Sequence, residues 1–401
     1  MRRLNRFLVT GAAALTAAVL TTGCGIAQLG APSAAQPEVA ASLAIVTGDA
    51  NSPTFQPTSA VDSLLADAFD HHDAVAVVDA GGRPRVLAAT VLGGNYGNSI
   101  AMSAGRSAQL AAVAADLARV VPAAAESDPW AAFVTAIDWV AGHGGGTVVV
   151  ANDGLGTKGL LNYTQPGLLE AEPAQVVAFA RSHNELPAAA HGLHVVLAGL
   201  GWSAPPQPAL DQASRANLTA QWQALAAAAG AFVTLDPTPQ TEPGPSAPPV
   251  TVIRPTTFAW RAPVGTCGVA LDSVHLRFEV GTASYADPAA ATSTLHSVVE
   301  TLTANHQPAT VTGTTSSEGG DALNAALSTS RALATAQTME SLGLPPTQIA
   351  RTVGVGYRFA GHIPDTAPDG TLLPGPAAAD RQVIITWPCT PNEPPGVTTG
   401  P

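Results

Sequence analysis

The fold of the C-terminal part is decided by one stretch, Gly313-Thr-Thr-Ser-Ser-Glu-Gly-Gly-Asp-Ala-Leu-Asn-Ala-Ala-Leu-Ser-Thr-Ser-Arg-Ala332. The two residues before it, Val311 and Thr312, end a short extended segment. Residues 313–320 are rich in the glycine and small polar residues that form turns. From Ala322 to Leu342 apolar residues recur at helical spacing. The pattern predicts a strand, a loop and a helix, with Arg331 on the helix a few turns beyond the loop.

The same stretch resembles the core motif of the OmpA-like peptidoglycan-binding domain family. That motif has Gly, Thr, Asp, Gly, Asn, Leu-Ser and Arg-Ala at fixed offsets. All but one of these residues are present, as Gly313, Thr315, Gly319, Asn324, Leu327, Ser328, Arg331 and Ala332. The departure is Ser316, which stands where the family has aspartate.

The resemblance implies a pocket for meso-diaminopimelate of the peptidoglycan stem peptide, lined by Thr315, Ser316, Asn324 and Arg331. In the family the loop carboxylate binds the amine end of this ligand, and the helix arginine binds its carboxylate through paired hydrogen bonds. Ser316 has no charge, so its interaction with an ammonium should be weaker by roughly 1–2 kcal/mol, or about tenfold in affinity. The alternative for Arg331 is a structural ion pair with a nearby Glu or Asp.

The resemblance covers the chain from about Val269 to Trp387. Val274–Phe278 looks like the opening strand, residues 353–357 resemble a short Gly-x-Gly strand, and Asp380–Trp387 resembles the closing strand. The implied fold is βαβαβ-β, a small α/β sandwich with helices on one face of a mixed sheet. Arg381 is then a second candidate ligand contact, or else it forms a salt bridge in the closing strand.

The beginning of the chain resembles the signal peptide of a bacterial lipoprotein. Three arginines precede an apolar run at residues 7–20, which is too short to count as a membrane-spanning helix. Gly23-Cys24 resembles a lipobox, in which the cysteine is lipidated, although Thr21 stands where Leu, Val or Ile is usual. This implies a cell-envelope protein with a lipid anchor (palmitate and related acyl chains) on the outer side of the cytoplasmic membrane or in the outer membrane. The alternative is an ordinary secretory signal cut near Ala34.

The cysteine count fits this interpretation. If Cys24 is lipidated, Cys267 and Cys389 remain as an even pair in an exported and oxidising setting, on either side of the OmpA-like region. We therefore expect a disulfide bond between them. Two distant thiols without a Cys-x-x-Cys pair do not favour a metal site.

Composition excludes some classes of partner. Three of the 17 Lys and Arg residues precede the apolar run, which leaves 14 against 29 Asp and Glu, a formal charge of −15. This charge argues against nucleic acid as a partner and against a basic membrane-binding patch. No cofactor is expected.

Linkers divide the chain into parts. The predicted organisation is a signal peptide at 1–23, a tether at 24–39, an α/β domain at 40–235, a proline-rich linker at 236–256, the OmpA-like domain at 257–390 and a disordered tail at 391–401.

The α/β domain at 40–235 alternates strand-like and helix-like segments. Five short apolar runs have the β-branched content of buried parallel strands: 43–46, 74–78, 147–150, 194–197 and 231–234. Helical stretches fit between them, at 60–69, 107–120, 131–141, 173–182 and 212–229. The pattern predicts a doubly wound, largely parallel sheet. It resembles a von Willebrand factor A-like domain through Val148–Asp153 and the strand that leads to Asp49.

Two segments of this domain partly match known functional sites, one a metal site and the other a hydrolase site. A metal site of that family needs Asp-x-Ser-x-Ser, and the corresponding residues run from Asp49 to Pro53, which has no side-chain oxygen. We expect no metal there. Ser103 and the His143–Gly146 run imitate parts of a hydrolase site. A hydrolase site needs a buried strand directly before the nucleophilic serine, but loop sequence precedes Ser103. Hydrolases also place the His-Gly run before the serine, whereas here it follows. We therefore expect no catalytic residues.

The predicted function is that of a noncatalytic envelope lipoprotein. Its OmpA-like domain binds peptidoglycan, and its α/β domain recognises a protein partner that the sequence does not identify. The alternative is an envelope enzyme or solute-binding protein that a vestigial OmpA-like domain only localises.

Overall fold

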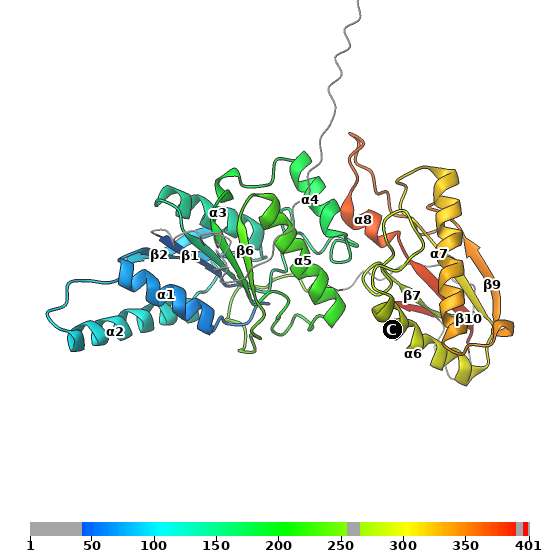
Figure 1. The fold of residues 1–401 in the computed structure, drawn as a ribbon, viewed down its shortest axis with the longest axis horizontal. Coiled ribbons are helices and arrows are strands. Elements are labelled where there is room, and N and C mark those ends of the chain that lie inside the picture. Colours follow the sequence, from blue (N-terminus) through cyan, green and yellow to red (C-terminus); the bar gives the residue numbers. More distant parts are fainter. Residues whose placement is uncertain (1–41, 255–264, 390–395, 400–401) are drawn as a thin grey trace, which may run out of the picture. The chain divides into compact units, whose positions relative to one another are not determined.

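The computed structural model describes residues 42–254, 265–389 and 396–399. They form two β-sheets, of six and five strands (Figure 1). We call residues 42–254 the N-terminal domain and the other two ranges the C-terminal domain. The predicted signal peptide, Cys24 and the tether lie outside the described residues. None of the helices in the described ranges has both the length and the hydropathy needed to cross a membrane.

The N-terminal sheet is mostly parallel. Its strands are β1 (Ser42–Thr47), β2 (Ala74–Asp79), β3 (Arg85–Val91), β4 (Thr147–Ala151), β5 (His194–Ala198) and β6 (Phe232–Asp236). Their order is β3-β2-β1-β4-β5-β6, and only the pair of β2 and β3 is antiparallel. The doubly wound, mostly parallel sheet predicted from the sequence is confirmed. Strand β3, at the edge, was not predicted.

Both faces of this sheet are covered, which explains the continuous apolar runs of its strands. Ala44 and Val46 of β1 belong to one hydrophobic core, and Leu43 and Ile45 belong to the other. The first core includes α3 (Pro129–Gly142), α4 (Pro173–Ser182) and α5 (Gln212–Ala228), with the 3-10 turn η1 (Ala188–Ala190). The second includes α1 (Ser59–His71) and α2 (Ser99–Ala118). In Figure 1, α1 and α3 lie on opposite sides of β1 and β2.

Helix α2 starts eight residues earlier than the predicted Ser107. The Asn98 side chain accepts a hydrogen bond from the Ala101 backbone N–H and caps the helix there. Ser103 is therefore inside a helix and not on a strand-to-helix turn, while His143 stacks on Trp139 at the end of α3. Neither residue has the setting that a hydrolase site requires.

The C-terminal sheet is mixed. Its strands are β7 (Thr266–Leu271), β8 (Ala309–Gly313), β9 (Ile349–Gly354), β10 (Val383–Pro388) and β11 (Gly396–Thr399), in the order β11-β7-β10-β8-β9. Strand β10 is antiparallel to β7 and β8, whereas β9 and β11 are each parallel to a neighbour. One core joins a single face of the sheet to α6 (Pro288–Asn305) and α7 (Asp321–Ser341). The predicted strand, loop and helix around residues 311–342 are confirmed. The short elements η2 (Pro346–Gln348) and α8 (Pro374–Ala379) complete the domain.

Two predictions about this domain are wrong. The opening strand is β7, and Val274–Phe278 is a loop, because the Asp272 carboxylate accepts hydrogen bonds from the backbone N–H groups of Val274 and His275 and turns the chain. The C-terminal tail is not wholly irregular, because β11 pairs in parallel with β7.

The proline-rich linker has no helix or strand in residues 237–254, but it packs on the N-terminal domain. The Thr54 backbone N–H donates to the Pro243 carbonyl at 3.2 Å, and Gln240 exchanges hydrogen bonds with the backbone of Gln56. Ile253 is 2% exposed and belongs to the domain core. The described part of the linker therefore packs against the N-terminal domain and contributes Ile253 to its core, so it is not a free spacer.

The predicted disulfide bond is confirmed. Cys267 on β7 and Cys389 just after β10 are bonded, with their Cα atoms 4.9 Å apart. The bond links the first strand of the domain to the end of β10, across 122 positions of sequence.

Two glycines let α7 lie directly against the sheet. A Cβ atom added to Gly313 would be 2.2 Å from the Ser328 carbonyl oxygen, and one added to Gly354 would be 2.1 Å from the Thr329 nitrogen. Only glycine allows this approach. The same helix contact fixes the position of Arg331, one turn further along α7.

Candidate ligand-binding pocket

One pocket brings together the five candidate ligand-binding residues predicted from the sequence. It has a volume of about 420 Å³. It lies over the 314–319 loop and the first half of α7. The predicted residues that line it are Thr315, Ser316, Asn324, Arg331 and Arg381. Their common location is established, whereas their role with a ligand remains a proposal.

Hydrogen bonds hold the loop of residues 314–319 in place, in which Ser316 stands where the family has aspartate. The backbone N–H of Thr314 donates to the Gln382 carbonyl at 2.9 Å, and that of Thr315 donates to the Gly356 carbonyl at 3.1 Å. The buried carboxylate of Asp365 accepts from both the backbone N–H and the hydroxyl of Ser317, at 2.7 and 2.5 Å. The loop is thus fixed on both sides of Ser316.

Arg331 is a buried guanidinium at the pocket wall. Its side chain comes from α7, and the residue is only 8% exposed. Nε donates to the Thr282 carbonyl at 2.9 Å, and the guanidinium lies 5.0 Å from the centre of the Phe278 ring. Burial, with the nearby charge of Arg381, lowers the pKa of Arg331 to about 10. It therefore remains positive at neutral pH. Within the described part of the chain, its contacts are with carbonyl groups and an aromatic ring, and not with the carboxylate that the ion-pair alternative requires.

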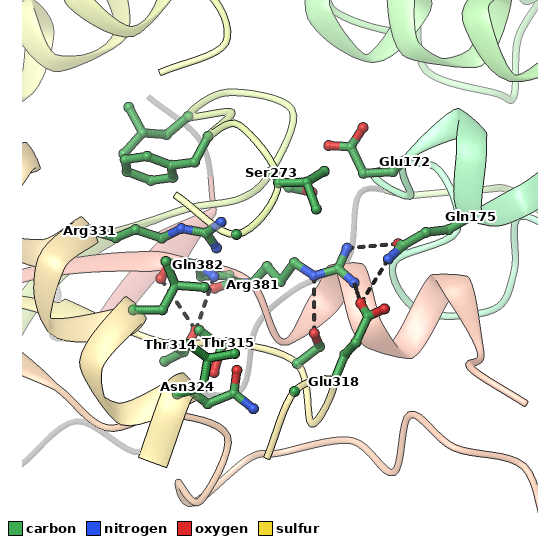
Figure 2. Close-up of a pocket in the computed structure, with 18 of the residues that line it drawn as sticks. Glu172, Gln175, Ser273, Thr314, Thr315, Glu318, Asn324, Arg331, Arg381 and Gln382 are labelled. Atoms are coloured by element: carbon green, nitrogen blue, oxygen red, sulfur yellow. Dashed lines mark hydrogen bonds and ion pairs between the residues drawn. The ribbon is translucent and has the colours of Figure 1, made fainter. Parts of the chain in front are cut away.

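Arg381 is the second guanidinium, and it lies just before β10. Nε donates to the Ser316 hydroxyl at 3.2 Å, Nη1 donates to Gln175 Oε1 at 2.8 Å, and Nη2 is 3.7 Å from Glu318 Oε2 (Figure 2). Burial lowers the pKa of Arg381. Both hypotheses made for Arg381 apply in part: it forms a salt bridge, although with the loop and not within the closing strand, and it faces the pocket.

Among the described residues, four that line the pocket have a buried side-chain atom with no hydrogen-bond partner. The atoms are the Thr315 hydroxyl, the Asn324 amide nitrogen, Gln382 Oε1 and Arg381 Nη2, the last of which has only the 3.7 Å ion pair with Glu318. Thr315 and Asn324 are each 2% exposed. An unpaired buried donor or acceptor costs about 1–3 kcal/mol. A polar ligand in the pocket would supply the missing partners.

Two further polar residues of the pocket come from the N-terminal domain, and no local sequence pattern indicates them. Glu172 and Gln175, from the N-terminal end of α4, line the same pocket as the C-terminal residues. The described residues of both domains belong to one compact unit of the chain. Glu172 Oε1 is 3.3 Å from the Nε of Arg277, and the Ser273 hydroxyl donates to the Glu170 carbonyl at 2.8 Å.

The carboxyl ends of β1 and β4 form a second polar cluster. Asp49 accepts hydrogen bonds from the backbone N–H groups of Asn51 and Ser52, the Ser127 hydroxyl and the Asn152 amide, all at 2.8–2.9 Å. Among the residues that the structure describes, no three His, Cys, Asp or Glu side chains group as a metal site would require. Gln240 of the linker lines the small space beside this cluster, and no water-sized volume remains there.

Asp153, beside this cluster, has a pKa in the folded protein that lies well above the ordinary value of an aspartate. Burial and the neighbouring charge of Asp49 raise the pKa of Asp153, and one of its carboxyl oxygens has no partner among the described residues. A raised pKa in the folded state favours stability at low pH, and that contribution is lost as the pH rises through the folded pKa.

Asp153→Asn, which mimics the protonated acid, should therefore be more stable than the wild type by about 1 kcal/mol at pH 8. The two should converge near pH 4, and thermal unfolding at both pH values measures this. Asp49→Asn is the matched control and should destabilise, because an amide nitrogen cannot accept the bonds that Asp49 accepts. A constant difference between Asp153→Asn and the wild type from pH 4 to pH 8 would contradict the assignment.

Comparison with known families confirms the C-terminal resemblance. Residues 277–361 match the model of the OmpA family. Comparison with curated proteins finds no match.

Solved structures align with part of the chain. The OmpA-like domain of FopA1 from Francisella tularensis is 26% identical, and the alignment covers 33% of this chain and 78% of that one, with a TM-score of 0.23. The peptidoglycan-associated lipoprotein from Burkholderia pseudomallei is 18% identical over 28% of this chain and 87% of its own, with a TM-score of 0.23. The cell wall anchor of the T6SS from Pseudomonas aeruginosa is 18% identical, and the alignment covers 30% of this chain and 80% of that one, with a TM-score of 0.25.

Proposed function

We propose that the C-terminal domain binds peptidoglycan through this pocket, with the meso-diaminopimelate of a stem peptide as its ligand. The observation that supports this most directly is the pair of guanidiniums, on the buried Arg331 and the partly buried Arg381, in a pocket next to the OmpA motif loop. A planar guanidinium binds a carboxylate through two parallel hydrogen bonds. The unpaired atoms of Thr315 and Asn324 would bind further polar atoms of the peptide.

The mouth of the pocket suits the aliphatic part of such a ligand. Val280 and Leu323 line it and are 86% and 60% exposed, while Leu276 and Phe278 form part of its apolar wall. Diaminopimelate has a hydrocarbon stem between its two polar ends. Covering these exposed side chains would contribute about 25 cal/mol per Å² of apolar surface removed from water.

We further propose a noncatalytic role in the cell envelope. A lipid on Cys24 would anchor one end of the chain in a membrane, and the C-terminal domain would hold the cell wall, while the N-terminal domain recognises a protein. The rival proposal is an enzyme or solute-binding protein that the C-terminal domain localises. The closed space beside Asp49, lined by the linker, favours the noncatalytic role.

The variant Ser316→Asp tests whether the ligand is meso-diaminopimelate, which carries an ammonium group. The added carboxylate would restore an ionised partner for the ligand ammonium, and a charged hydrogen bond is about twice as strong as a neutral one. We expect affinity to rise by about tenfold, measured by sedimentation with purified peptidoglycan that contains meso-diaminopimelate.

A matched control separates this effect from the change in net charge. Ser330→Asp adds the same charge on the exposed side of α7, outside the pocket, and should bind as the wild type does. Equal binding by Ser316→Asp, Ser330→Asp and the wild type would show that a carboxylate on the loop adds nothing to binding, whereas binding by none of them would count against a diaminopimelate ligand.

A further inference from the structure

Helix α4 of the N-terminal domain forms one wall of the pocket. We propose that Glu172, at the start of this helix, supplies the carboxylate that Ser316 cannot, so that the ligand's ammonium binds to Glu172 while its carboxylate binds to Arg331. The binding site would then require both domains. This inference rests on the proposed function, because it assigns a second residue to the same ligand.

The side chain of Glu172 lines the pocket and does not cap its own helix. It occupies the N-cap position of α4 but makes no side-chain capping hydrogen bond. Gln175, three residues later and hence on the same face of the helix, also lines the pocket and accepts the 2.8 Å hydrogen bond from Arg381. Figure 2 shows both side chains on the α4 side of the pocket, across from Asn324.

Among the side chains that line the pocket, the charges balance only when Glu172 is counted; Arg277, the ion-pair partner of Glu172, does not line the pocket. The charged lining residues are Arg331, Arg381, Glu172 and Glu318. Without Glu172, the buried guanidinium of Arg331 and the partly buried one of Arg381 would face the single carboxylate of Glu318, whose side chain is 61% exposed and therefore well screened by water. The Glu172 side chain is 23% exposed, so its field in the pocket is stronger.

Electrostatics in the folded chain agree with this assignment. Burial lowers the pKa of both Arg331 and Arg381, and the charge of Glu172 opposes that effect at each. Ser316, by contrast, already accepts a hydrogen bond from Arg381 Nε. Glu172 is also partly occupied, because its Oε1 is 3.3 Å from the Nε of Arg277, but its carboxylate has a charge and further acceptor positions. The Ser316 hydroxyl has no charge, so it is the poorer partner for an ammonium group. The ligand chemistry that fits is an amino-acid end with one free ammonium and one free carboxylate.

A double-mutant cycle on the full chain tests the proposal, with purified peptidoglycan that contains meso-diaminopimelate as the probe. Glu172→Gln should bind about tenfold more weakly than the wild type. In the Ser316→Asp background the same change should have no effect, because the loop would again supply the carboxylate. Glu340→Gln removes a carboxylate from the exposed face of α7, outside the pocket, and should not alter binding.

The outcomes separate this inference from the proposed function. Unchanged or tighter binding by Glu172→Gln would overturn the inference, and tighter binding would mean that Glu172 covers the pocket. Weaker binding that Ser316→Asp does not restore would also overturn it, because Glu172 would then act only by joining the domains through Arg277. If neither the wild type nor Ser316→Asp binds, the proposed function itself fails.

Discussion

Replacing both Cys267 and Cys389 by Ala should lower the free energy of unfolding of the C-terminal domain by about 4 to 5 kcal/mol. The bond spans 122 positions, and in the chain-entropy model a bridge that closes a loop of roughly 100 residues restricts the unfolded chain by about this amount. The expected loss is a large part of the stability of an ordinary domain. Guanidinium unfolding followed by circular dichroism measures it.

The wild type under reducing conditions is the matched control, because reduction should bring its unfolding midpoint close to that of the double variant. A free thiol at both positions in the native, unreduced protein, detected by labelling, would contradict the bond. Unchanged stability of the double variant would show that the bond forms but contributes little.

The N-terminal sheet was predictable because its inner strands are buried on both faces. Such strands have few polar residues, as in Val148–Val150, and this pattern is visible without any knowledge of tertiary contacts. Strand β3 lacks this signal because it is an edge strand whose residues are mostly exposed. The start of α2 was missed because small residues follow Asn98, and they indicate a helix only weakly.

The opening strand of the C-terminal domain was misplaced for a physical reason. Val274, Leu276 and Phe278 alternate with polar residues as in a half-buried strand. In the structure Leu276 is buried and Phe278 stacks on Tyr285, so this alternation comes from a packed loop. Strand β7, with a glycine in its middle, is less distinctive in sequence.

The pocket was predictable only where its residues belong to segments that resemble the family, which are the motif stretch and, for Arg381, the closing segment. Thr315, Ser316, Asn324 and Arg331 have fixed offsets along one loop and one helix, so sequence places them together. Glu318 lies in the same stretch and was overlooked. Glu172 and Gln175 come from a helix about 140 positions earlier in the chain, and no local pattern relates them to the loop. Asp365, which holds Ser317, is likewise visible only through tertiary contacts.

Arg331→Ala should abolish detectable binding to peptidoglycan. The guanidinium would make two charged hydrogen bonds to the ligand carboxylate, and their loss should cost about 3 kcal/mol, or roughly 150-fold in affinity. Arg331→Lys keeps the charge but lacks the planar fork, so it should recover only a small part of the binding. Sedimentation with purified peptidoglycan compares the two variants with the wild type.

Folding must be measured in the same variants, because Arg331 also has a structural role. Its Nε–H holds the Thr282 carbonyl, and its guanidinium lies against Phe278. A thermal unfolding curve separates a lost ligand contact from a collapsed loop, since Arg331→Lys should keep the melting temperature closer to the wild type than Arg331→Ala does. If the wild type, Ser316→Asp and Arg331→Ala all sediment equally with peptidoglycan, the pocket is vestigial. The C-terminal domain would then retain the OmpA fold as a structural or protein-contact module without its ligand.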